Sequence, residues 1–85
     1  MPINPVDPDV RFAQIWHIAT LGLPSTLMEG TNSWILLTNM GLVKRRGYNW
    51  MRQRVYSAVR AGYIVEHNPT PGKKRRFVAV QDKLV

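Results

Sequence analysis

Cationic side chains gather in the second half of this sequence and are the residues best suited to chemistry. From residue 44 to 85 the chain carries eleven Lys and Arg against two acidic residues, whereas residues 1–43 carry one basic residue against three acidic ones. The halves therefore have formal charges of +9 and −2, and the whole 85-residue chain has +7. This imbalance favours binding to a polyanion such as DNA, RNA or an anionic surface. A basic surface kept only for solubility is the alternative.

The segment 49–61 holds the side chains best suited to reading a nucleotide sequence. Met51, Val55, Ala58 and Val59 recur at helical spacing and predict a buried stripe. The opposite face then presents amides, hydroxyls and a guanidinium, which can bond base edges in a major groove. No acidic residue lies in this segment, although a solvated helix face usually mixes charges. The candidate base-reading residues are Asn49, Gln53, Tyr56, Ser57 and Arg60.

Other cations are placed to contact phosphates. Some precede or flank the segment 49–61, where helix amides also favour phosphate. Four more are consecutive beside a turn, where their mutual repulsion suits a phosphate contact better than a structural role. The alternative for these positions is a solvated loop. The candidate backbone-binding residues are Lys44, Arg45, Arg46, Arg52, Arg54, Lys73, Lys74, Arg75 and Arg76.

Catalysis and cofactor binding lack the necessary side chains. The chain has no cysteine, and His17 and His67 are far apart with few carboxylates, so we expect no metal site. Glu29 and Glu66 form no acid pair, and the serines have no obvious activating base. We therefore expect no enzyme, no cofactor and no small-molecule substrate. No apolar run approaches the ~20 residues of a membrane span, and the N-terminus does not resemble a signal peptide.

The first half of the chain predicts two helices that act as scaffold. Residues 1–6 are interrupted by prolines and are expected to be flexible. A helix should follow, with Asp7 as N-cap and Pro8 in the first helical position, and end near Leu21. Residues 23–30 are expected to form a connector that can include a short strand. A second helix should start at a cap among residues 31–33 and end at Gly41; since it is apolar nearly all round, we expect it to be buried.

The second half predicts a third helix over 49–61, ended by Gly62, and then two strands. The strands should span 63–67 and 76–80, pair as a hairpin and enclose a turn over 68–72. The domain should cover residues 7–82, with a tail at 83–85. Trp16 and Trp34 are expected in the core, while Trp50 is equally suited to stacking on a base or packing against the loop near residue 48.

The order of three helices and a hairpin resembles a winged helix-turn-helix domain. Residues 55–64 are similar to the end of a recognition helix that runs into the first wing strand, and residues 72–80 to a basic wing tip and its returning strand. The spacing Arg60-Ala61-Gly62-Tyr63 also resembles small helix-turn-helix regulators of bacteriophages. The link from Gly41 to Asn49 is longer than the tight turn of that motif. The expected fold class is α+β, mostly α: a three-helix winged helix-turn-helix with a C-terminal β-hairpin wing.

The resemblance implies a DNA-binding protein, namely a small phage-type transcriptional regulator. Helix 49–61 would dock in the major groove of double-stranded DNA, and the basic wing 68–76 would lie on the adjacent backbone. A homodimer would recognise two half-sites. The protein would act in the cytoplasm, or in the host cytoplasm or nucleoid if phage-encoded, without a membrane partner.

Two other functions fit the same residues. A DNA- or RNA-binding accessory factor without sequence specificity would use Tyr48, Trp50 and Tyr56 as stacking platforms. A protein-interaction adaptor would instead bind an acidic partner protein through Arg75 and Arg76. Fold alone does not decide among them.

Overall fold

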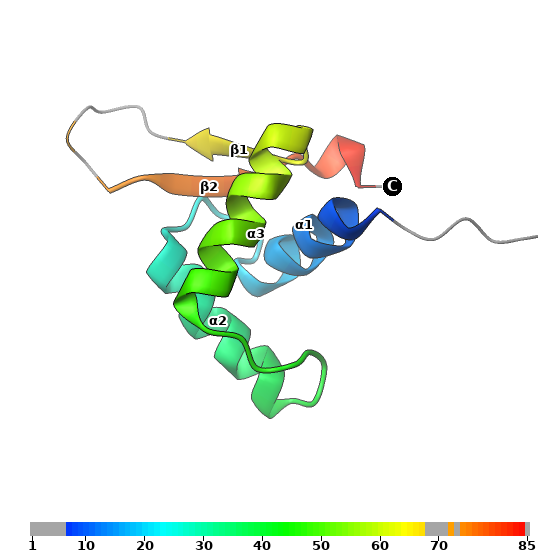
Figure 1. The fold of residues 1–85 in the computed structure, drawn as a ribbon, viewed down its shortest axis with the longest axis vertical. Helices are drawn as coiled ribbons and strands as arrows, with labels where there is room; N and C mark the ends of the chain where they lie inside the picture. Colours follow the sequence, from blue (N-terminus) through cyan, green and yellow to red (C-terminus); the bar gives the residue numbers. More distant parts are fainter. Residues whose placement is uncertain (1–6, 68–71, 73, 85) are drawn as a thin grey trace, which may run out of the picture.

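Three helices precede a two-stranded antiparallel hairpin in this protein, whose computed structural model describes residues 7–67, 72 and 74–84 (Figure 1). The expected flexible segment 1–6, Lys73 and residues 68–71 of the turn lie outside the described residues. The coarse prediction of an α+β, mostly α fold is confirmed. The elements are α1 (Pro8–Ala19), α2 (Leu27–Asn39), α3 (Tyr48–Ala61), β1 (Ile64–His67), β2 (Arg76–Ala79) and the 3-10 turn η1 (Gln81–Lys83).

Helix α1 starts as its sequence predicts. The Asp7 side chain accepts a hydrogen bond from the Asp9 backbone N–H at 2.8 Å, and Pro8 occupies the first turn. Helix α1 ends at Ala19, two residues before the expected end. The chain then turns through Leu21 and Gly22, both at positive φ.

Helix α2 differs from the prediction at its start and in its burial. It begins at Leu27, because Thr26 and Glu29 form a capping box that satisfies the first backbone N–H groups. The proposed caps at 31–33 are therefore wrong. Leu36 and Met40 are 64% and 68% exposed, so the helix is not buried all round. Only the side that bears Leu27, Gly30, Thr31 and Trp34 meets the rest of the domain.

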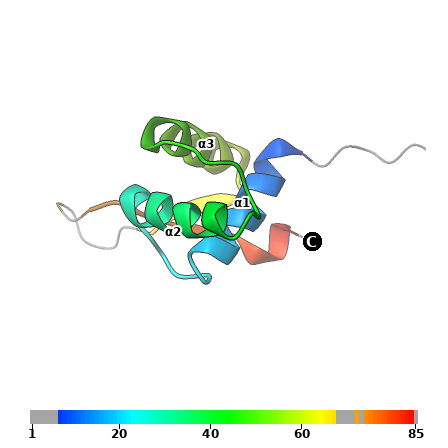
Figure 2. The ribbon, with the colours of Figure 1, turned by 90° about the horizontal axis from the view of Figure 1, so that it is seen from below.

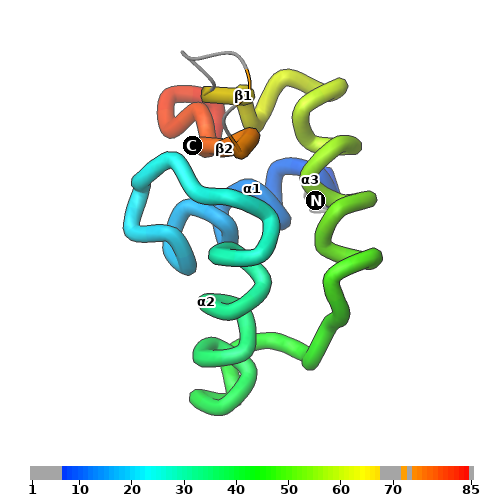
Figure 3. Tube along the Cα trace, turned by 90° about the vertical axis from the view of Figure 1, so that its left-hand side faces the viewer, coloured from blue at the N-terminus to red at the C-terminus, as the bar shows by residue number. Residues whose placement is uncertain are grey.

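Helix α3 and the hairpin lie close to the expected residues. Helix α3 begins one residue early, at Tyr48, and Gly62 ends it in the left-handed conformation at φ 89°. In the hairpin, Ile64 pairs with Ala79 and Glu66 with Phe77. The connector 20–26 contributes a single bridge, in which Ser25 pairs with Phe77, in place of a strand. Figure 3 shows α2 and α3 side by side, joined at their lower ends by the connector 40–47.

The core forms where the three helices and the hairpin meet (Figures 1 and 2). Its largest fully buried side chains are Trp16, Phe77, Met51, Ile64 and Val55. The Trp16 indole donates to the Phe77 carbonyl oxygen at 3.2 Å, so its buried N–H is satisfied. The prediction that Trp16 and Trp34 belong to the core is confirmed.

Lys83 and Leu84 are part of the fold rather than of a tail. Leu84 is buried, and its carbonyl oxygen accepts a hydrogen bond from the Gln14 side chain at 2.8 Å. The domain therefore extends two residues beyond the expected boundary at residue 82. Among the described residues, no helix is long and apolar enough to cross a membrane.

Candidate nucleic-acid interface

The exposed side of α3 carries the polar residues that the sequence assigns to base reading. Met51, Val55 and Ala58 are fully buried and fix the inward side of the helix. Asn49, Gln53 and Arg60 lie opposite them and are exposed. Side chains of Arg52, Gln53, Arg54, Tyr56, Ser57 and Arg60 surround a hollow of about 420 Å³ on this side.

Tyr56 and Ser57, the other two candidate base-reading residues, lie half-buried at the edges of this strip. The Ser57 hydroxyl donates to an Asp9 carboxylate oxygen at 2.8 Å. The Tyr56 hydroxyl accepts from Nη1 of Arg75 at 3.0 Å. Each hydroxyl thus already has a partner within the protein, whereas the side chains of Asn49, Gln53 and Arg60 face solvent.

The flank of α3 that faces α1 is held by a cluster of aromatic rings and an ion pair. Trp50 packs against Phe12 and Trp34, with ring centroids 5.7 and 5.4 Å away. The guanidinium of Arg46 covers its ring at 4.8 Å. Arg54 forms an ion pair with Asp9 at 3.1 Å. Trp50 is thus packed within the protein, against Phe12 of α1, Trp34 of α2 and Arg46 of the connector 40–47.

A cation-lined groove of about 500 Å³ lies along this flank. The Trp34 indole donates to the Lys44 carbonyl oxygen at 2.9 Å and so holds the connector that forms one wall. Arg45 is exposed on the same connector but does not line the groove. The charged residues of the lining are all basic: Arg11, Lys44, Arg46 and Arg54.

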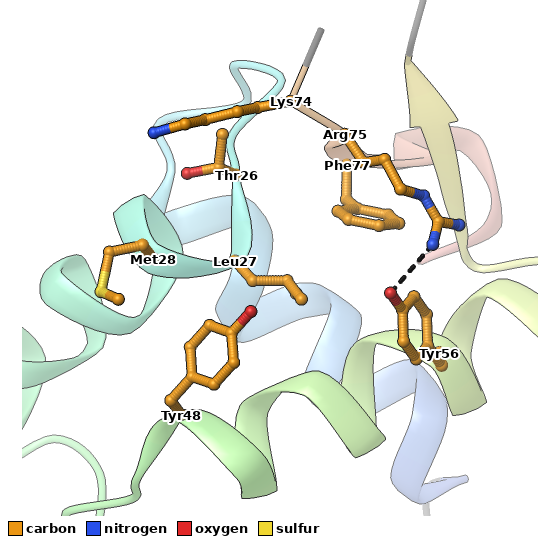
Figure 4. A pocket seen from close by; sticks show the side chains of 8 residues that line it. All are labelled: Thr26, Leu27, Met28, Tyr48, Tyr56, Lys74, Arg75 and Phe77. Carbon is orange, nitrogen blue, oxygen red and sulfur yellow. Dashed lines mark hydrogen bonds between the residues drawn. The ribbon is translucent and has the colours of Figure 1, made fainter. Parts of the chain in front are cut away.

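The opposite flank of α3 borders a second groove, of about 350 Å³, which separates the helix from the hairpin and the start of α2 (Figure 4). Tyr48 and Tyr56 line it from α3, and Lys74 and Arg75 from the chain just before β2. Arg52 lies on the same flank, with its guanidinium 5.7 Å from the Tyr56 ring. In Figure 4 the Lys74 side chain extends past Thr26, at the start of α2.

A carboxylate near this second groove is stabilised in its charged form. The backbone N–H of Thr26 donates to Glu29 and lowers the pKa of that carboxyl below its ordinary value of 4.5. The Thr26 hydroxyl and the charges of Arg76 and Lys74 lower this pKa further. Glu29 thus occupies the N-terminus of α2 as its capping anion.

The cations near the tip of the hairpin, at and just before the start of β2, differ in their surroundings. Lys74 and Arg76 are exposed. Arg75, also exposed, forms an ion pair with Glu66 on the neighbouring strand in addition to its bond to Tyr56. Lys73, the remaining member of the predicted basic block, lies outside the described residues.

Two residues of the site are absent from the sequence-based set. Arg11 lines the groove between α1 and α3, and nothing in its local sequence indicates this. Asp9 holds two side chains of α3 that lie 45 and 48 residues away in sequence. Contacts at that separation have no local sequence signal.

The arrangement offers cationic and polar groups that suit binding. Within the described part of the chain, no group of three or more His, Cys, Asp or Glu residues could hold a metal ion. The site combines an exposed polar helix face with a cation-bearing groove on each side. No protein-family model, curated protein or solved structure matches this chain.

Proposed function

We propose that this chain is a DNA-binding protein of the winged helix-turn-helix type, a small phage-type transcriptional regulator that acts in the cytoplasm. Helix α3 docks in the major groove of duplex DNA, and the hairpin lies on the adjacent backbone. Asn49, Gln53 and Arg60 contact base edges. The proposal is for a binding protein and includes no catalytic step.

The observation that carries this proposal is the pair of basic grooves on opposite flanks of α3. A helix in a major groove lies between two sugar-phosphate backbones. The groove with Lys44 and Arg46 suits one backbone, and the groove with Lys74 suits the other. The exposed strip between them suits the base edges, because its neutral amides and one guanidinium match the donors and acceptors found there.

The aromatic side chains favour duplex DNA over a single strand. A base stacks on an aromatic ring only where a ring face is open. Trp50 is covered by Arg46 and packs against two other rings, and Tyr56 packs edge-on against Phe77 at 5.9 Å. Tyr48, at 41% exposed, is the more open ring. Two of the three stacking candidates are therefore engaged within the protein.

Binding of random-sequence duplex DNA at several salt concentrations, followed by selection of the bound pool, tests the proposal. If about five phosphates are neutralised, the slope of log K against log salt should be about −4 to −5. An enriched motif is expected in the bound pool. Binding without enrichment would favour an accessory factor, and no binding at low salt would favour an acidic protein partner.

Two substitutions distinguish base reading from backbone contact. Gln53→Ala should relax the preference at one or two base pairs, at a cost of about 1–3 kcal/mol on the preferred site. Gln81→Ala, which removes an exposed amide from η1, is the matched control and should change neither the affinity for DNA nor the base preference. Lys74→Ala should weaken binding to all DNA sequences equally. It should also make the slope of log K against log salt shallower by about 0.9. If Gln53→Ala also weakens binding to all DNA sequences equally, α3 is not the element that recognises base pairs.

A further inference from the structure

Arg75 differs from its basic neighbours because its side chain contacts other residues of the protein. It lies just before β2, and its Nε donates to Glu66 on β1 in an ion pair. Its Nη1 donates to the Tyr56 hydroxyl on α3 at 3.0 Å, as Figure 4 shows. Its guanidinium also lies 5.2 Å from the Tyr56 ring centroid and 5.5 Å from that of Phe77. We call Arg75, Glu66, Tyr56 and Phe77 the Arg75 cluster.

The cluster connects the hairpin to the buried core of the domain. Phe77 is fully buried, and its backbone exchanges two hydrogen bonds with Ser25, at 2.8 and 3.0 Å. Its carbonyl oxygen also accepts from the Trp16 indole. The start of β2 is therefore fixed to α1 and to the connector before α2. Arg75, two residues further toward the tip, extends this attachment to α3.

The geometry limits what Arg75 can offer to DNA. Its Nε and one terminal nitrogen already have oxygen partners, and its guanidinium lies near two aromatic rings. Lys74 and Arg76 on either side are exposed, and their side chains form no hydrogen bond or ion pair with other described residues. Neighbours in one basic block thus have different surroundings.

We propose that Arg75 is a positioning residue rather than a phosphate contact: through Glu66 and Tyr56 it sets the angle of the hairpin against α3. This inference rests on the proposed function. With the hairpin held at this angle, Lys74 lies beside the groove that would receive one DNA backbone. Glu66, an acidic residue within the basic half, thereby promotes binding to a polyanion although its own charge opposes it.

The sign of the effect of Glu66→Gln tests this role. The substitution removes a negative charge beside the interface, so electrostatics alone predicts tighter DNA binding. The Arg75 cluster predicts the reverse, about two- to fivefold weaker binding, because exposed ion pairs contribute modestly. Asp82→Asn in η1 is the matched control, since it removes the same charge from an exposed site outside the cluster. Glu66→Gln binding as tightly as Asp82→Asn, or tighter, would overturn the proposal.

The salt slope gives a second, independent readout. Arg75→Ala should weaken binding and leave the slope of log K against log salt unchanged, whereas Lys74→Ala should reduce it by about 0.9. Tyr56→Phe, which keeps the ring and removes the hydroxyl, should weaken binding less in the Arg75→Ala background than in the wild type. A slope reduced equally by Arg75→Ala and Lys74→Ala would assign Arg75 to phosphate.

Hydrogen exchange of the free protein separates failure of this inference from failure of the proposed function. Glu66→Gln and Arg75→Ala should speed exchange of the β1 and β2 amides relative to Asp82→Asn, while the amides of α1 keep their protection. This measurement needs no DNA. If the wild type binds no DNA but the hairpin amides respond, the proposed function fails and the cluster stands. If they do not respond, the positioning role is wrong.

Discussion

At the scale of single residues, Gly30 reverses the usual effect of replacing a helical glycine. In a helix interior, Gly→Ala normally stabilises by about 1 kcal/mol. A Cβ at Gly30 would lie 2.2 Å from two ring carbons of Trp16, whose side chain is fully buried. Gly30→Ala should therefore destabilise the protein by about 1–3 kcal/mol or more, as measured by urea unfolding.

Asn32→Ala is the control on the same helix. Asn32 is exposed in α2, so alanine there should stabilise by a few tenths of a kcal/mol, up to about 0.7. Opposite signs at two positions of one helix would isolate the contact with Trp16. If Gly30→Ala stabilises as Asn32→Ala does, the close packing of α1 on α2 is wrong. The prediction from the sequence places Gly30 in the connector 23–30, and the Trp16 ring that requires a glycine there is distant in sequence.

At the scale of elements, the cap of α2 predicts a specific dependence on pH. Glu29 has a pKa below 4.5 in the folded protein because it accepts the Thr26 backbone hydrogen bond. A carboxyl whose pKa is lowered by folding contributes stability above its unfolded pKa and loses it as pH falls through the folded value. The free energy of unfolding should therefore decrease as the pH is lowered below about 4.5.

Glu29→Gln isolates this contribution, since glutamine can keep the hydrogen bond of a capping box without the charge. The variant should be less stable at neutral pH by about 0.3–1 kcal/mol, the usual value of an anion at a helix N-terminus. Its loss of stability on acidification should be smaller than that of the wild type in urea titrations from about pH 7 to 3. Parallel pH curves for the two proteins would contradict the role given to Glu29.

Elements with strong local signals were predictable from the sequence, and those that depend on tertiary contacts were not. Asp7-Pro8 marks the start of α1, and Gly62 the end of α3, since each acts on the backbone of its own segment. The Thr26-x-x-Glu29 capping box is also local, and recognising it would have placed the start of α2. The exposure of Leu36 has no such signal, because composition does not say which side of a helix meets a neighbour.

At the scale of the molecule, the sequence placed the candidate site but not its internal contacts. The charge imbalance and the helical spacing in 49–61 correctly predicted the exposure of Asn49, Gln53 and Arg60. The same reasoning treated all cations alike. Arg54 and Arg75 form ion pairs with Asp9 and Glu66, and only the folded chain brings these partners together. Whether the surface binds DNA stays a prediction.

The uneven charge also predicts that salt acts in opposite directions on the free protein and on its DNA complex. The chain has a net charge of +7, and two ion pairs are formed among the described residues. Cations that line the same grooves repel one another, and this repulsion weakens as the Debye length falls from about 30 Å at 0.01 M to about 10 Å at 0.1 M salt. Sodium chloride should therefore raise the Tm of the free protein by about 2–5 °C over this range.

The same salt should weaken DNA binding. Binding releases counterions from the DNA, and this release is less favourable when the salt concentration of the solution is higher. Calorimetry of the free protein and of its mixture with duplex DNA measures both effects, and the two Tm values should converge as salt increases. A Tm of the free protein that falls with salt would mean that Arg54–Asp9 and Arg75–Glu66 outweigh the repulsion. In that case repulsion within the basic surface lowers the stability of the free protein only slightly. The charge alone would then not distinguish a surface selected for binding from one kept for solubility.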